Sequence, residues 1–207
     1  MRNYSGGGVG GSSTPDFHGF VQKDAVRGGQ RYYSSSAIIS EWLTAGWFVQ
    51  SPTEIYAVPL LSTRGSAVTS LNSRAATIWG AVNKKARMGI YTATNQTSNL
   101  YPKNLVIDAG EQLMTDAALM TWPVAVTLDP GVLYWLVMTA ESGMGIYSLK
   151  PNCAWAINGT WAAERTNASS GAWYATLPAY GALPATFPTV SAAAQEGGPP
   201  FYTVTFG

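Results

Sequence analysis

Short β-forming runs separated by turn residues constrain the fold more than any other feature of this sequence. They recur from Glu54 to Phe206, and they are rich in Val, Ile, Tyr, Trp and Thr. Turns are explicit at residues 95–99, 129–131 and 158–159, because glycine and asparagine accept positive φ and proline presets a turn. We expect strands at residues 54–61, 75–82, 86–92, 104–109, 124–128, 133–139, 153–157, 172–177 and 201–206.

This spacing predicts an all-β chain in which two antiparallel sheets pack as a jelly-roll-like sandwich. Residues 32–48 allow two interpretations. A short helix could be capped by Ser36 and ended by Gly46, with apolar residues at helical spacing between them. Alternatively, a strand runs through Trp47 and turns at Pro52.

The N-terminal residues 1–31 form a separate unit, which precedes a sandwich domain at residues 32–207. This first unit is rich in glycine and lacks apolar periodicity, so we expect an extended arm that is disordered alone. Ordering such an arm costs about 1–2 kcal/mol per residue, which contact with a neighbouring subunit can offset. We therefore predict anchoring to a partner and a homo-oligomer, with a trimer as the first guess. The candidate anchoring residues are Tyr4, Val9, Phe17, Phe20 and Val21.

The segment from Pro178 to Pro200 carries five of the twelve prolines. We expect this segment to wander over the surface of the sandwich. The run after it, residues 201–206, alternates apolar and polar residues and is expected to return as a strand.

Charge is scarce and balanced, which excludes several classes of function. Only 11% of the residues are charged and the net charge is +1, against about 25% charged residues in an average protein. No basic run could neutralise several phosphates, so we expect no nucleic-acid partner. No stretch approaches about 18 apolar residues, and the N-terminus lacks the apolar core of a signal peptide, so we expect no membrane insertion. The single cysteine, Cys153, excludes an internal disulfide.

Three stretches follow one another in the middle of the chain: RMGIY at residues 87–91, YPKNLVIDAG at residues 101–110 and LDPGVLYWL at residues 128–136. In this order they resemble a module of tailed-bacteriophage structural proteins. The resemblance covers about residues 32–140. It implies a β-sandwich found in fibres, spikes, tail proteins or capsid decorations, some of which are thought to bind glycans.

The residues of these stretches have a structural interpretation of their own. Alternation places Met88 and Ile90 on one face of a strand, while Gly89 permits close approach of a neighbouring strand. Residues 129–131 form a tight turn between two core strands.

The leading hypothesis is a non-enzymatic virion protein, most simply a capsid decoration, head fibre or short tail appendage. It would be assembled in the host cytoplasm and held to other capsid or tail proteins by its arm. A second hypothesis makes the same fold a receptor-binding module of a tail fibre or spike, with host surface polysaccharide as the ligand.

Catalytic machinery is sparse. The single histidine, His18, lies in the arm, which argues against a Ser-His-Asp or Cys-His device and against a zinc centre. We therefore expect no catalytic residue, no metal and no cofactor. A polysaccharide hydrolase needs only two carboxylates, so it stands as a third hypothesis, although most acids are expected at solvated strand ends or turns. The available acids are Asp108, Glu111, Asp116, Asp129, Glu141 and Glu164.

Aromatic residues gather in the region from residue 155 to residue 180. Aromatic rings stack on the apolar faces of sugars, so they could form a glycan site. They could equally fill the sandwich core or a subunit interface, where tryptophan and tyrosine are also enriched. The candidates are Trp155, Trp161, Trp173, Tyr174 and Tyr180.

Overall fold

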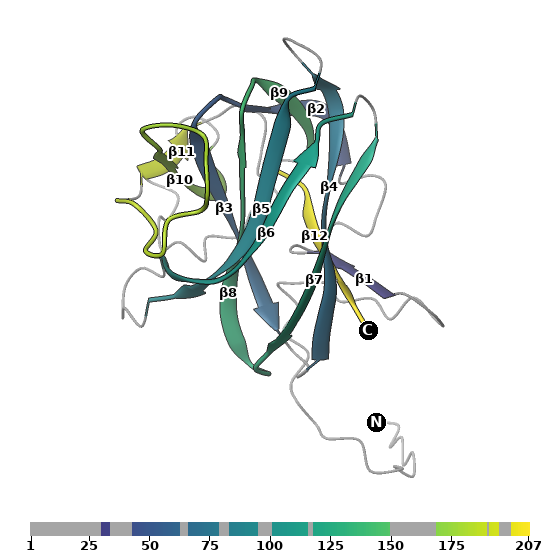
Figure 1. Cartoon of the computed structure of the whole chain (residues 1–207), viewed down its shortest axis with the longest axis vertical. Coiled ribbons are helices and arrows are strands. Elements are labelled where there is room, and N and C mark those ends of the chain that lie inside the picture. Colours follow the sequence, from purple (N-terminus) through teal and green to yellow (C-terminus); the bar gives the residue numbers. More distant parts are fainter. Residues whose placement is uncertain are drawn as a thin grey trace, which may run out of the picture.

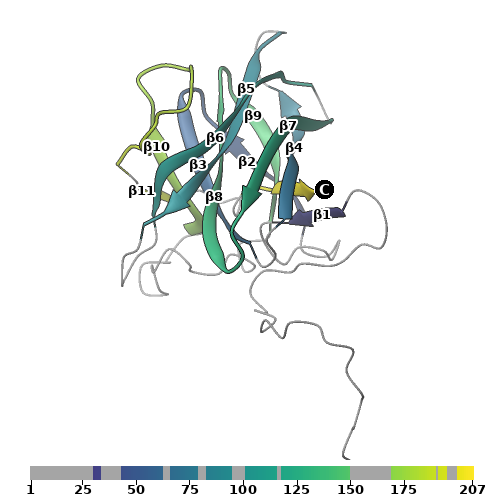
Figure 2. The same cartoon turned by 60° about the horizontal axis from the view of Figure 1, so that its bottom comes forward.

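The chain folds into two six-stranded antiparallel sheets that pack face to face (Figures 1 and 2). This computed structural model describes residues 30–33, 43–62, 66–78, 83–94, 101–115, 118–149, 169–189, 191–194 and 200–207. All strand pairs in these ranges are antiparallel, and no helix occurs in them. The predicted all-β sandwich is therefore confirmed.

The first sheet has the strand order β1-β12-β4-β9-β2, with β7 paired to β4. Its strands are β1 (Gln30–Tyr33), β2 (Leu43–Gln50), β4 (Ser66–Ile78), β7 (Leu119–Leu128), β9 (Met144–Leu149) and β12 (Tyr202–Phe206). The second sheet has the order β11-β10-β3-β8-β5-β6. Its strands are β3 (Glu54–Ser62), β5 (Lys85–Ala93), β6 (Pro102–Leu113), β8 (Val132–Ala140), β10 (Ser169–Thr176) and β11 (Ser191–Ala194). Most connections cross between the sheets, as in a jelly roll.

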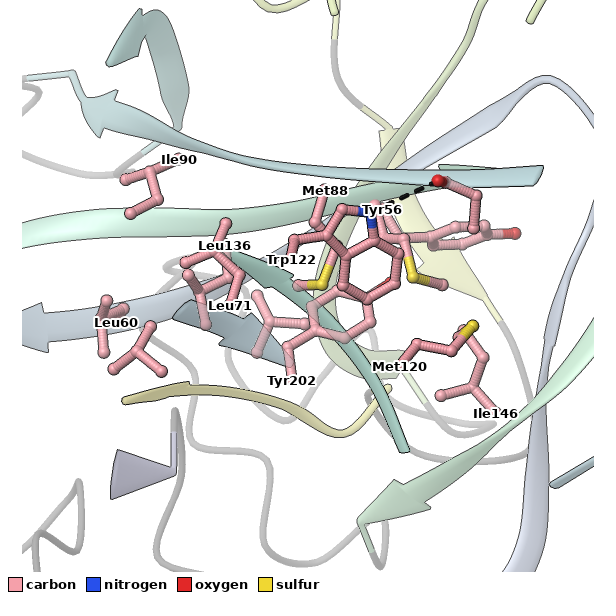
Figure 3. Packing of buried hydrophobic residues seen from close by; sticks show 14 of the residues in the cluster. Tyr56, Leu60, Leu71, Met88, Ile90, Met120, Trp122, Leu136, Ile146 and Tyr202 are labelled. Atoms are coloured by element: carbon pink, nitrogen blue, oxygen red, sulfur yellow. Dashed lines mark hydrogen bonds between the residues drawn. The ribbon is translucent and has the colours of Figure 1, made fainter. Parts of the chain in front are cut away.

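A large apolar core fills the space between the two sheets. Trp122 of β7 is fully buried in it, and its indole N–H donates to the carbonyl oxygen of Ala86 at 3.4 Å. Around it lie Met88, Met120 and Tyr202, as Figure 3 shows. Because a buried indole N–H needs an acceptor, this bond lets the largest side chain of the core point inward.

The second sheet is also buried on its outer face. Alternate residues of β3, β5, β8 and β10 point away from the first core and form a second core. Residues 177–189 follow β10 (Figure 1) and are called the strap below. They add apolar side chains to this outer cluster. The second core contains Ile55, Ala57, Tyr91, Trp135, Val137, Trp173, Ala175, Leu177, Leu183 and Phe187. Burial on both faces explains why β8 reads as a continuous apolar run.

Most expected strands occur, with altered bounds. The predicted strand at residues 75–82 coincides with the end of β4, which covers Ser66–Ile78, and its residues 79–82 lie outside the described residues. Strand β7 begins at Leu119 rather than Val124. Residues 43–48 belong to β2, so the strand interpretation of that segment is correct and the helix is not formed there. The turn at residues 129–131 is confirmed, with Gly131 at φ 74°. The expected strand at residues 153–157 lies outside the described residues.

The expectation that residues 178–200 wander over the surface is wrong for the strap. Leu183 and Phe187 of the strap are 5% and 6% exposed, and β11 follows it. The physical reason is that the outer face of the second sheet is apolar, and these two side chains bury it by packing against it. The arm lies outside the described residues up to residue 29, and β1 begins at Gln30.

Candidate functional site: the clamp beneath the strap

Residues of two of the three sequence stretches, 87–91 and 101–110, meet at one place, where β5 and β6 hold the strap. Met88 and Ile90 of β5 are fully buried in the first core, as predicted. The alternating residues Arg87, Gly89 and Tyr91 therefore face the strap. With Asp108 of β6 they form the clamp, the name used here for these four residues.

Asp108 is the centre of the clamp. Its two carboxylate oxygens each accept a 2.9 Å hydrogen bond from Nη1 of Arg87. Oδ1 also accepts from the Gly110 N–H at 2.8 Å, and Oδ2 accepts from the Leu183 N–H at 3.0 Å. The side chains of Arg87 and Asp108 are only 15% and 20% exposed. A single carboxylate thus joins β5, β6 and the strap by charge-assisted hydrogen bonds.

Gly89 leaves room for the strap to approach. A Cβ atom at this position would lie 2.6 Å from the carbonyl oxygen of Ile107 on β6 and would collide with Cδ1 of Leu183. The expected close approach of a neighbouring strand at Gly89 is therefore confirmed. The strap uses the same space, since Leu183 packs over the glycine.

Tyr91 fixes the other half of the strap. Its hydroxyl donates to the carbonyl oxygen of Pro184 at 2.6 Å, and its ring meets Phe187 edge-on at a centroid distance of 5.2 Å. Burial, followed by the charge of Asp108, raises the pKa of Tyr91 well above its usual value. The tyrosine is therefore a neutral donor throughout the ordinary pH range.

Backbone hydrogen bonds continue the attachment along β6. The Leu105 N–H donates to the Ala185 carbonyl at 2.9 Å, and the Phe187 N–H donates to the Lys103 carbonyl at 2.7 Å. Asn104 and Thr186 form an isolated antiparallel bridge between these bonds. The strap consequently covers part of the free edge of β6, which would otherwise present unpaired backbone groups.

A chain of ion pairs extends from the clamp along the end of the sandwich. Arg87 Nη2 lies 3.1 Å from Glu111, Lys85 lies 2.8 Å from the same carboxylate, and Lys84 lies 3.2 Å from Glu141. Hydrogen bonds from Lys85 and then Arg87 lower the pKa of Glu111. A general acid of a glycosidase needs the opposite shift, so Glu111 is suited to ion pairing. Asp108 lies within β6, paired and largely buried, rather than at a solvated strand end.

The predicted glycan-contacting residues do not form one platform in the described part of the chain. Trp173 and Tyr174 are neighbours on β10 and point to opposite faces. Trp173 is 4% exposed and its ring lies 4.7 Å from that of Tyr101, while Tyr174 stacks on Tyr56 at 5.8 Å. Tyr180 is half-buried in the strap.

The remaining predicted contact residues cannot be placed. Trp155 and Trp161 lie outside the described residues, as do the anchoring candidates Tyr4, Val9, Phe17, Phe20 and Val21. Glycan contact by the first two and anchoring by the arm stay predictions.

Sequence reasoning missed the strap-binding role of Arg87, Tyr91 and Asp108. A signal for a second apolar layer was present, because β8 contains Leu133 to Met138 without a polar residue. Such a run indicates a strand that is covered on both faces.

Comparison of the sequence with protein-family models and with curated proteins finds no match. Within the described ranges, no helix is long and apolar enough to cross a membrane. The same residues hold no group of three or more histidine, cysteine or acidic side chains arranged to bind a metal ion.

Proposed function

We propose that this chain is a non-enzymatic structural protein of a bacteriophage particle, most simply a capsid decoration, head fibre or short tail appendage. The observation that carries the proposal is the convergence of the phage-like motifs on the clamp. Arg87, Gly89 and Tyr91 come from one motif and Asp108 from the next; Gly89, Tyr91 and Asp108 contact the strap, and Arg87 bonds to Asp108. Motif residues that build one structural unit support a shared fold module rather than a chance resemblance.

The described surface also suits assembly with other proteins. The outward residues of β7 are exposed and uncharged, and they include Thr121, Pro123, Ala125 and Thr127. Six of the charged residues are instead joined in the ion pairs at the clamp. Neighbouring subunits can approach an uncharged face without paying to desolvate ions.

The N-terminal arm is the proposed attachment. Residues 1–29 precede β1, and their glycine-rich sequence suits an extended segment that orders on another virion protein. The sandwich would project from that point. We propose a homo-oligomer, with a trimer as the first candidate.

Mass spectrometry of gradient-purified particles from producing cells tests this function. The full chain should co-sediment with particles through a high-salt wash, and a chain lacking residues 1–29 should be lost from them. A matched variant, Asp129→Ala, changes an exposed turn residue and should be incorporated like the unaltered chain. Absence of the full chain from washed particles would refute the proposal.

The polysaccharide-binding alternative predicts a different result. The purified chain should then bind host envelope polysaccharide in native mass spectrometry, and Trp161→Ala should abolish that binding. Incorporation into particles without such binding favours the purely structural role.

A further inference from the structure

Thr53 has a backbone conformation that threonine rarely adopts. Its φ is 62°, in the left-handed region that favours glycine. Because threonine is branched at Cβ, this conformation is disfavoured by a factor of about ten. Asn83 is the other non-glycine residue with a positive φ among those that the structure describes, and asparagine tolerates it better. Surrounding contacts must therefore hold Thr53 in its strained state.

Two backbone hydrogen bonds join Thr53 to both neighbours of its strand. It directly precedes β3, which lies between β8 and β10 in the second sheet. Its N–H donates to the carbonyl oxygen of Ala140 at the end of β8, and its carbonyl oxygen accepts from the N–H of Leu177, which follows β10. In a regular antiparallel strand, the N–H and C=O groups of one residue point to the same neighbour. The positive φ of Thr53 directs them to different neighbours.

The bond to the strap is the shortest of those that restrain this turn. The nitrogen of Leu177 lies 2.8 Å from the carbonyl oxygen of Thr53, whereas the nitrogen of Thr53 lies 3.3 Å from the oxygen of Ala140. The bond from the Glu54 N–H to the Ser51 carbonyl oxygen, which closes the turn, measures 3.4 Å. Both longer bonds exceed the usual range of about 2.7–3.2 Å. The strap therefore supplies the main restraint on Thr53.

Leu177 is also the point where the strap leaves the sheet. Pro178 follows it and has no N–H, so it cannot continue the hydrogen bonds between β3 and β10 as a donor. The side chain of Leu177 is 6% exposed in the second core, to which Leu183 and Phe187 also belong. Detachment of the strap from that core therefore carries Leu177 away from Thr53.

We propose that the strap is a releasable cover and that the strained backbone of Thr53 favours its release. The closed strap holds Thr53 at a positive φ through Leu177. When the strap detaches, Thr53 loses that bond and relaxes to a negative φ. The open state is therefore populated about tenfold more than it would be with an unstrained residue at this position. This inference concerns the conformation of the fold and goes beyond the proposed function, because it can be tested on the purified chain alone.

Thr53→Gly tests the proposal by hydrogen exchange and proteolysis of the purified full chain. Glycine adopts a φ of this sign without strain, so the strap should open about tenfold less often. The amide protons of Leu177 and Leu183 should exchange about tenfold more slowly, and chymotrypsin should cleave the Tyr180–Gly181 bond more slowly by the same factor. Amides between β5 and β8 should nearly keep their exchange rates, because glycine also raises the entropy of the unfolded chain.

Three further variants make the result specific. Thr53→Val keeps the branched Cβ and removes the hydroxyl, so its strap should open as often as that of the unaltered chain. Asn83→Gly changes the other positive-φ position, an exposed turn residue before β5, and should leave exchange and cleavage of the strap unchanged. Thr53→Asn should act in the same direction as glycine by a smaller factor, so the test still stands if the glycine variant does not fold.

Two results would overturn the proposal. One is unchanged or faster exchange of the Leu177 and Leu183 amides in both Thr53→Gly and Thr53→Asn. The other is an equal slowing of these amides and of the amides between β5 and β8, because the substitution would then stabilise the whole fold rather than the closed strap.

Discussion

Replacing Asp108 with alanine should release the strap while the first core stays folded. The change removes the Arg87 ion pair and the acceptor of the Gly110 and Leu183 N–H groups. Hydrogen bonds to a charged group contribute about 1.5–3 kcal/mol each when buried. Because Asp108 and Arg87 are 20% and 15% exposed, solvent reduces these values. We expect the free energy needed to detach the strap from the second sheet to fall by about 3 kcal/mol.

Chymotrypsin and hydrogen exchange report this release directly. Residues 177–189 contain no lysine or arginine, and their one bond suited to chymotrypsin is Tyr180–Gly181, because Leu183 and Phe187 are each followed by a proline, which blocks cleavage. A loss of about 3 kcal/mol corresponds to about 100-fold more of the open state. The amide protons of Leu105 and Phe187 should exchange faster by that factor. Amides between β3 and β8 should keep their protection.

Two variants control this experiment. Asp108→Asn keeps one acceptor oxygen for the Leu183 N–H, so its effect should be intermediate. Asp129→Ala removes an exposed turn acid whose carboxylate accepts a 3.5 Å hydrogen bond from Tyr134 and bonds to no residue of the strap, so it should leave the cleavage rate of the strap unchanged. If Asp108→Ala is cleaved and exchanges its amide protons at the same rates as the unaltered chain, the carboxylate does not hold the strap.

Three further predictions concern other parts of the fold. Gly89→Ala should lower the free energy of unfolding, measured in urea, by about 3 kcal/mol or more, because the new methyl group meets both Leu183 and a backbone carbonyl. A urea midpoint equal to that of the unaltered chain would contradict this packing. Pro123 interrupts an uncharged edge strand, so Pro123→Thr should increase self-association in light scattering, and an unchanged mass distribution would count against it. Burial raises the pKa of Tyr91 and Tyr202, so the folded state retains protons that the unfolded chain loses above pH 10. Stability should be complete below pH 10 and fall above it, and absorbance at 295 nm should show these tyrosines ionising only as the protein unfolds; early, reversible ionisation would contradict their burial.

The sandwich was predictable because its strands carry local signals. In β5, the alternation of Met88 and Ile90 with Gly89 and Tyr91 indicates one inward and one outward face. The turn at Gly131 requires a positive φ, which glycine accepts readily. Signals of this kind depend on neighbouring residues and need no knowledge of distant contacts.

The strap could not be predicted in the same way. Its apolar residues Leu183 and Phe187 stand singly among proline, glycine and alanine, without the period of a strand or helix. They are ordered by the outer face of β5 and β8, which lies far away in the sequence. The proline content therefore correctly indicated that the strap has an irregular backbone. The burial of its side chains depends on the sheet beneath it, which the sequence of the strap does not reveal.

The clamp shows the same limit at the level of single residues. The motif containing Arg87 and the motif containing Asp108 were both recognisable from the sequence. Their pairing across 21 residues depends on the register of β5 and β6, which is shifted by irregularities near Gly89. Sequence spacing alone does not fix such a register, so the role of these residues required the structure.

Density in the intact particle tests the proposed function most directly. In a cryo-electron microscopy reconstruction, we predict a two-layered β-sandwich on the particle surface, with residues 1–29 lying against another virion protein. The density should disappear from particles produced without this chain. Particles from cells that produce the chain, but that show no such density, would contradict the proposal.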